Sequence, residues 1–270
     1  MECLGGSLLS ATMRGMAGAS LLMQIVSFAP LALAVCLCLM RAEVLPGGWR
    51  LAHAIENRYV AKARERAWHG LDRLEQIRAA QRSTPEGAVL WIGSSTVEMF
   101  PVRQHWPRTP HLNAGIAATR ADHLARLLPQ LLPPLPLGGV VVIAGTADRL
   151  ALPRAPEQAA AAAERLLDAL RRALPTTPIV VVGPLPEREP AEGAADTRAE
   201  VQTLRAQLRA AAAERGLAFV DPAQDPLVDE QFRLRRECSV DEVHLSPMGY
   251  AHLARMITAA EGPVGALLRP

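Results

Sequence analysis

The stretch Ala88-Val89-Leu90-Trp91-Ile92-Gly93-Ser94-Ser95-Thr96 decides the fold. Its opening run of apolar residues, closed by glycine and serine, is typical of a strand that is buried on both faces. A serine directly after such a strand, where the chain turns into a helix, has its hydroxyl at the sheet edge and its N–H at a helix N-terminus, where negative charge is favoured. Because Glu98 follows Ser95 by three residues, the segment also fits a simple helix capping box.

Further apolar runs repeat this pattern along the chain. They cover 139–144, 178–182 and 217–220, with another short strand around Leu112, and helical stretches separate them at about 119–130, 156–173, 196–215 and 247–261. Strands that alternate with helices indicate a parallel sheet covered on both faces. We therefore expect a three-layer α/β domain over 86–262, with about five parallel strands. Ligands of such folds bind at the carboxyl ends of the strands.

Two of the segments that carry chemistry lie farther along the chain. Asp241-Glu242-Val243-His244 places an aspartate three residues before a histidine. Such an aspartate can bind one imidazole nitrogen and leave the other free to take a proton, which is the base-and-orienter half of a catalytic triad. Gly145-Thr146-Ala147-Asp148 follows the apolar run at 139–144, and by itself it is only a turn at a strand end.

Taken in this order, the segments resemble the ordered blocks of the SGNH (GDSL-type) hydrolases. The resemblance covers residues 86–262. Gly93-Ser94-Ser95-Thr96 matches the G-D-S-L block with serine in place of the acid, Asn113-Ala114-Gly115-Ile116-Ala117-Ala118 resembles the second block, Gly145-Thr146-Ala147-Asp148 resembles G-x-N-D, and Asp241-Glu242-Val243-His244 matches D-x-x-H. The α/β-hydrolase fold fits less well, because G-x-S-x-G is absent and the aspartate directly precedes the histidine in chain order.

The resemblance implies a three-layer, flavodoxin-like SGNH-hydrolase fold and a serine esterase. Ser95 would be the nucleophile, His244 the general base and then acid, and Asp241 the residue that orients the imidazole. The reaction would be acyl or acetyl ester hydrolysis, or acyl transfer, through a covalent intermediate. The expected substrate is a small-molecule, glycan or lipid ester, and neither a cofactor nor a metal ion is expected.

Two positions of the expected oxyanion hole depart from the family pattern. The second block normally ends in glycine and here ends in Ala118, which still offers its backbone N–H beside that of Ser95. The asparagine of G-x-N-D is replaced by Ala147, which has no side-chain donor, and losing one such donor costs about 10²–10³ in rate. Arg120, Arg149 and Thr146 are candidates for a third donor. Two hypotheses follow: a slow esterase, or a catalytically degenerate binding or accessory domain in a cell-envelope system.

The amino-terminal region predicts a membrane segment. No charged residue lies between Arg14 and Arg41, and the apolar core Leu21–Met40 is about the length that crosses a bilayer. A cleaved signal peptide is the alternative, although the apolar run is long for one. We expect a tail and transmembrane anchor over 1–42 with its helix at about 17–40, a helical stalk or linker over 43–85, and the hydrolase-like domain over 86–270.

The membrane orientation and the partners are harder to predict from the sequence. Arginines flank both ends of the apolar segment, and the positive-inside rule alone favours a cytoplasmic domain. Anchored relatives usually face outward, so the resemblance favours a periplasmic domain on a bacterial inner membrane, and the single lysine, Lys62, in an Arg- and Ala-rich chain fits a GC-rich bacterium. The net charge of +2 speaks against nucleic-acid binding. The cysteines show no zinc-site spacing, and no pattern sets an oligomeric state.

Overall fold

The computed structural model describes residues 65, 67–150, 155–188, 197–224 and 226–269. A five-stranded sheet lies at its centre, with the strand order β2-β1-β3-β4-β5, and every pair of neighbouring strands is parallel. The strands are β1 (Val89–Gly93), β2 (His111–Gly115), β3 (Gly139–Ile143), β4 (Ile179–Val182) and β5 (Ala218–Val220). The structure confirms the predicted α/β fold with five parallel strands, and the order is that of flavodoxin.

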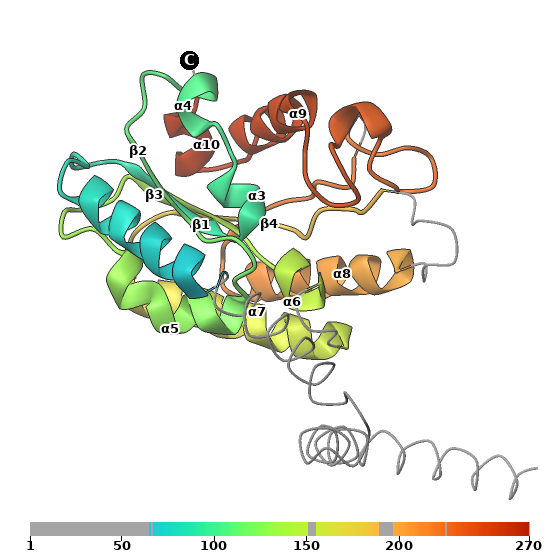
Figure 1. Ribbon diagram of the computed structural model, residues 1–270, viewed down its shortest axis with the longest axis horizontal. Coiled ribbons are helices and arrows are strands. Elements are labelled where there is room, and N and C mark those ends of the chain that lie inside the picture. Colours follow the sequence, from blue (N-terminus) through green and yellow to red (C-terminus); the bar gives the residue numbers. More distant parts are fainter. Residues whose placement is uncertain (1–64, 66, 151–154, 189–196, 225, 270) are drawn as a thin grey trace, which may run out of the picture. The chain divides into compact units, whose positions relative to one another are not determined.

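Helices cover both faces of the sheet. Those described are α3 (Ser95–Glu98), α4 (Val102–His105), α5 (Ala121–Leu131), α6 (Thr146–Leu150), α7 (Pro156–Ala173), α8 (Arg198–Glu214), α9 (Pro247–Thr258) and α10 (Pro263–Leu267), with a 3-10 turn at Arg236–Cys238. Figure 1 shows α5, α7 and α8 on one side of the sheet and α4, α9 and α10 on the other. The short helices α4, α6 and α10 were not predicted, because a single turn carries no readable periodicity.

The alternation of side chains along β1 explains the two-sided core. Leu90 and Ile92 join the apolar cluster under α5, α7 and α8, whereas Val89 and Trp91 join the cluster under α9. All of these side chains are fully buried, as successive strand residues in a covered parallel sheet must be. The first apolar run of the sequence is therefore the centre of both cores.

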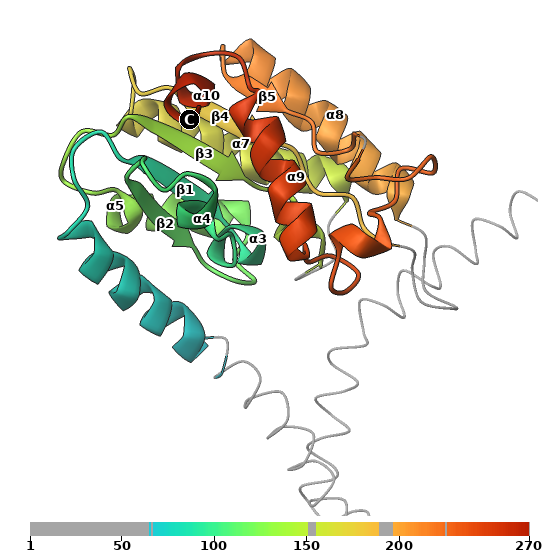
Figure 2. The same cartoon turned by 90° about the horizontal axis from the view of Figure 1, so that it is seen from above.

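A helix at residues 67–81 precedes the first strand, and it lies within the helical stalk or linker expected over 43–85. Figure 2 shows it along the β2 edge of the sheet. Ile77 is buried in the core under α5 and α7, and Leu74 and Ala80 pack against the same cluster. Residues from Trp68 onward form one compact unit, so this helix packs on the domain.

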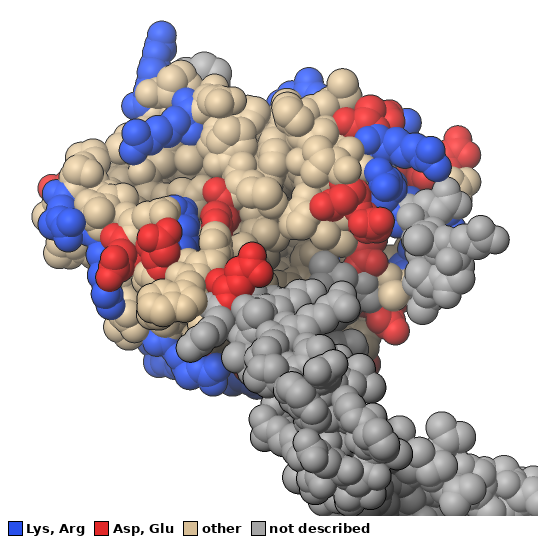
Figure 3. Space-filling view, viewed as in Figure 1, with Lys and Arg blue, Asp and Glu red and all other residues tan. Residues whose placement is uncertain are grey.

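The predicted transmembrane helix at 17–40 lies outside the described residues, as do the tail and most of the expected stalk. Within the part of the chain that the structure does describe, no helix combines the length and the apolar character needed to cross a membrane. On the face shown in Figure 3, acidic and basic side chains are interspersed, and neither sign forms a continuous field there.

Candidate functional site

Ser95 lies where β1 turns into α3. A Cβ added to Gly93 would come within 2.4 Å of Val97 Cγ2 and 2.5 Å of the Ile143 carbonyl oxygen, so this tight turn requires glycine. Ser94 is the N-cap of α3 and makes no side-chain capping bond, and Ser95 is the first helical residue. The predicted capping box is therefore not formed. The Glu98 carboxylate instead accepts a hydrogen bond from the backbone N–H of Ala117.

The structure brings Ser95, His244 and Asp241 together, although they come from two distant parts of the chain. His244 Nε2 is 3.0 Å from Ser95 Oγ, and His244 Nδ1 is 2.7 Å from Asp241 Oδ2. A carboxylate accepts hydrogen bonds only, so Nδ1 carries the proton and the lone pair of Nε2 faces the Ser95 hydroxyl. This tautomer suits the imidazole for taking a proton from Ser95.

Asp241 is fixed by hydrogen bonds from its own loop. Its Oδ1 accepts the backbone N–H of Val243 at 2.9 Å and that of His244 at 2.7 Å, which leaves Oδ2 for the imidazole. Burial alone would raise the pKa of the Asp241 carboxyl, but the hydrogen bonds from the His244 ring and from these two backbone groups outweigh it and hold the pKa below its usual value. The carboxylate is therefore ionised at neutral pH.

Helix α9 supports the segment that carries His244. Ser246 is its N-cap, with Pro247 in the first turn, and the Ser246 hydroxyl accepts the Gly249 N–H at 3.2 Å. The buried Tyr250 hydroxyl donates to the Thr96 carbonyl oxygen at 2.9 Å. Because Thr96 directly follows Ser95, this bond ties the helix that follows the histidine to the helix that carries the serine.

The loop at residues 116–119, here called the Ala118 loop, follows β2 and carries the first altered position. Ala118 has a φ of 55°, in the left-handed region that glycine occupies without strain, and alanine there costs roughly 1–2 kcal/mol. Neither the backbone N–H of Ala118 nor that of Ser95 donates to an acceptor in the described part of the chain. Both groups therefore remain available as hydrogen-bond donors.

The second altered position, Ala147, lies partly exposed in the first turn of α6 and has no polar side-chain atom. The structure describes the surroundings of two of the three candidate replacement donors. Arg120 Nε is 3.5 Å from Asp122 Oδ1. Thr146 Oγ1 is closed off from solvent and has no hydrogen-bond partner among the described residues, so a substrate oxygen does not reach it in this conformation. The Arg149 side chain lies outside what the structure describes.

The structure also gives roles to two residues of the quoted blocks to which the sequence assigned no contact. Asp148, almost fully buried, accepts the backbone N–H of Ala121 at 3.0 Å and so holds the chain just after the Ala118 loop. The Asn113 side-chain amide donates to the Val97 carbonyl oxygen at 2.7 Å, so it joins β2 to α3 and is not a spare oxyanion donor. No local pattern signals these contacts, because each joins residues far apart in the sequence.

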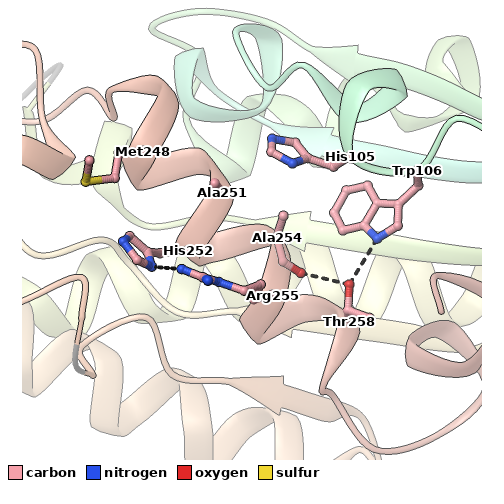
Figure 4. Close-up of a pocket in the computed structure, with 8 residues that line it drawn as sticks. All are labelled: His105, Trp106, Met248, Ala251, His252, Ala254, Arg255 and Thr258. Carbon is pink, nitrogen blue, oxygen red and sulfur yellow. Dashed lines mark hydrogen bonds between the residues drawn. The ribbon is translucent and has the colours of Figure 1, made fainter. Parts of the chain in front are cut away.

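A separate hollow lies between α4 and α9, as Figure 4 shows, and it has a volume of about 500 Å³. It is lined by His105, Trp106, Met248, Ala251, His252, Ala254, Arg255 and Thr258. Trp106 Nε1 donates to Thr258 Oγ1 at 3.0 Å across it. It contains none of the three residues joined at Ser95, so it is separate from that site.

Several solved structures have the same fold as this chain. A candidate platelet activating factor from Streptococcus pneumonia is 22% identical with a TM-score of 0.64, over 77% of this chain and 97% of the other. A GDSL-like lipase from Bacteroides thetaiotaomicron is 18% identical with a TM-score of 0.59, and the match covers 68% of this chain and 94% of the other. An acetyl xylan esterase is 14% identical with a TM-score of 0.50, and the match covers 63% of this chain and 96% of the other. At these identities the likeness shows the fold alone.

No protein with a curated description matches this chain in sequence. The sequence profile of the GDSL-like Lipase/Acylhydrolase family matches residues 97–252, which is more than half of the chain and includes Asp241 and His244. The match begins two residues after Ser95, within α3. The fold, the contact between Ser95 and His244 and this match lead to one conclusion: the chain belongs to the GDSL-like lipase/acylhydrolase family.

Proposed function

We propose that this protein is a serine carboxylic ester hydrolase with Ser95 as its nucleophile, His244 as its base and Asp241 as the group that orients the base. The observation that carries the proposal is the unbroken chain of contacts from Asp241 Oδ2 through the imidazole to Ser95 Oγ, at 2.7 Å and 3.0 Å. Three such groups in hydrogen-bond sequence are the signature of an activated nucleophile.

The reaction follows from this geometry. Ser95 Oγ attacks the ester carbonyl carbon while its proton passes to His244 Nε2, and the tetrahedral intermediate carries a negative oxygen. When the intermediate collapses, the C–O bond to the alcohol breaks and His244 returns the proton to the leaving oxygen. Water then attacks the acyl–Ser95 ester with the same base, and it releases the acid and restores the serine. An alcohol or sugar hydroxyl in place of water would give acyl transfer.

The oxyanion hole is the weak part of the proposed enzyme. Its donors are the backbone N–H groups of Ser95 and Ala118, and neither is taken by a described acceptor. The third donor of the family pattern is missing, because Ala147 stands at its position. Loss of one such donor lowers the rate about 10²–10³-fold. We therefore expect slow turnover of a small-molecule, glycan or lipid ester.

The proposal is tested with a short-chain aryl ester and a serine-directed phosphonate. The wild-type chain should hydrolyse the ester and take up one phosphonate, and Ser95→Ala should lose both properties, because the nucleophile is gone. Hydrolysis that persists unchanged in Ser95→Ala would exclude Ser95 as the nucleophile.

One observation favours a second candidate function, a degenerate binding or accessory domain of a cell-envelope system. Ala147 lacks the donor, Arg120 Nε lies 3.5 Å from Asp122 Oδ1, and Thr146 Oγ1 is closed off from solvent. Under this alternative the wild-type chain neither hydrolyses the ester nor reacts with the phosphonate, although the three residues still touch.

The cellular setting is proposed from the sequence. Residues 17–40 anchor the chain, by a single pass, in a bacterial inner membrane, and the domain faces the periplasm. Carbonate extraction of membranes that contain the protein tests the anchor. Full release into the supernatant would mean that the segment is cleaved or does not insert.

A further inference from the structure

We propose that Arg73 and Glu98 are positioning residues that brace the Ala118 loop and so hold its backbone donor in place for the reaction. The inference rests on the proposed function, because it assigns the loop a role in stabilising the oxyanion. Neither side chain forms a hydrogen bond with Ser95 or His244 in the described structure. Both would act through the backbone of the loop.

Arg73 fixes the start of the loop from the helix at 67–81. Its Nε donates to the Gly115 carbonyl oxygen at 2.9 Å, and its Nη2 donates to the Asn113 carbonyl oxygen at 2.9 Å. Strand β2 is at the edge of the sheet, so carbonyl groups two residues apart face outward without a partner strand. The fork of one guanidinium satisfies both of them. Residues Asn113 and Gly115, just before the loop, are therefore held by a side chain 40 and 42 positions upstream.

Glu98 fixes the middle of the loop from α3. Its Oε2 accepts the Ala117 N–H at 2.5 Å, and its Oε1 is 3.0 Å from His69 Nε2 on the helix at 67–81. Only 19% of the Glu98 side chain is exposed, and a hydrogen bond to an ionised, partly buried carboxylate is stronger than a neutral one. One short helix thus carries both Ser95 and the acceptor that holds the residue before Ala118.

Such a brace explains why alanine keeps a left-handed backbone at position 118. A strained residue persists only where its surroundings over-determine it. Here Arg73 holds the chain before the loop, Glu98 holds Ala117, and Asp148 holds Ala121 after it. Because stabilisation of the oxyanion depends on donors aimed before the charge forms, loosening the loop should reduce the rate of the chemical step.

The kinetic signature separates this role from general stability. The oxyanion exists only after attack, so a displaced donor lowers kcat and leaves KM nearly unchanged. In the full chain, Glu98→Ala should lose roughly 10- to 100-fold in kcat on the aryl ester, with KM within about threefold of wild type. Glu98→Gln should recover much of this loss, because its amide oxygen still accepts the Ala117 N–H.

Arg73→Ala should show the same split between kcat and KM, with a loss of about tenfold. Arg78→Ala is the matched control, because Arg78 also ties the helix at 67–81 to the domain, through Gln130 Oε1 at 2.7 Å, but does not touch β2 or the loop. It should stay within about twofold of wild type. Wild-type kcat in both Glu98→Ala and Arg73→Ala, or equal losses in Glu98→Ala and Glu98→Gln, would overturn the proposal.

Hydrogen–deuterium exchange of peptides that contain residues 116–119 gives a readout that needs no activity. In Glu98→Ala the amides of these peptides should exchange faster than in wild type. In Glu98→Gln and Arg78→Ala they should exchange at the wild-type rate. If the wild-type chain cleaves no ester and takes up no phosphonate, the proposed function fails, and the exchange experiment still decides whether the brace exists. Unchanged exchange in Glu98→Ala would refute it.

Discussion

The two halves of the Ser95 site differ in how well they match the family and in how they are held. The Asp241–His244 half matches D-x-x-H, and its contacts are short: 2.7 Å to the carboxylate and 3.0 Å to Ser95. The oxyanion half has alanine at both altered positions, and one of them, Ala118, has a strained backbone. The contrast is informative because side chains must supply the base, whereas a backbone N–H can supply an oxyanion donor from any residue but proline.

Removal of the base should have the largest effect. His244→Ala leaves Ser95 without a proton acceptor, and we expect the rate of ester hydrolysis to fall by at least about 10³-fold. Steady-state kinetics on a short-chain aryl ester measure it. His252→Ala, also at a histidine in this region but in the wall of the hollow between α4 and α9, should leave the rate within about threefold of wild type. Similar losses in the two variants would contradict the assignment of His244.

Asp241→Asn should have the next largest effect. The asparagine oxygen can still accept the Val243 and His244 N–H groups, but its NH₂ group would face Nδ1 and favour the wrong imidazole tautomer. The expected loss in kcat is roughly 10²–10⁴ with the fold intact. A large loss of kcat with an unchanged circular dichroism spectrum would support the tautomer explanation. A wild-type kcat would contradict it.

The lowered pKa of Asp241 adds a pH dependence to this comparison. A carboxyl whose folded pKa is lower than its unfolded value stabilises the fold above the unfolded pKa, near 3.8, and loses that contribution as the pH falls through the folded pKa. Wild type should therefore be more stable than Asp241→Asn at neutral pH, and the difference in unfolding free energy should shrink below about pH 4. Denaturant unfolding at several pH values measures it.

Restoring the missing amide should produce a smaller change, and an increase. The family pattern has asparagine where this chain has Ala147, so Ala147→Asn should recover part of the roughly 10²–10³ that one donor is worth. The double variant Ser95→Ala/Ala147→Asn is the control, and it should be inactive. An unchanged rate in Ala147→Asn, with no phosphonate uptake by Ser95 in either protein, would favour the accessory domain over the esterase.

The contrast between the halves also explains what the sequence could predict. The strand ending at Gly93 and the Asp241–His244 spacing are local patterns, so the sheet could be predicted from residue order, and the candidate triad could be named from the resemblance that these patterns carry. Glu98 was interpreted as a capping residue because its real partner, Ala117, is 19 positions away and is bound through its backbone. Arg73 is farther still from Gly115. Contacts between a side chain and a distant backbone group leave no periodic signal.

The smallest effect is expected at Ala118 itself. Ala118→Gly relieves the left-handed strain of roughly 1–2 kcal/mol, but it also adds freedom to the unfolded chain worth about 0.4–1 kcal/mol. The net gain in unfolding free energy should be about 1 kcal/mol or less. The backbone N–H remains, so the rate of ester hydrolysis should stay within about threefold of wild type. Denaturant unfolding and the aryl ester assay measure the two quantities.

Ala117→Gly is the matched control, because Ala117 is the neighbouring residue and its φ is not positive. There the glycine relieves no strain and only adds freedom to the unfolded chain, so the protein should lose about 0.5–1 kcal/mol. If the unfolding free energy rises in Ala118→Gly and falls in Ala117→Gly, the backbone strain belongs to Ala118 alone. A large rate loss in Ala118→Gly would instead mean that the methyl group shapes the site, and a purely backbone role for this residue would be wrong. The oxyanion half would then depend on its side chains, as the Asp241–His244 half does.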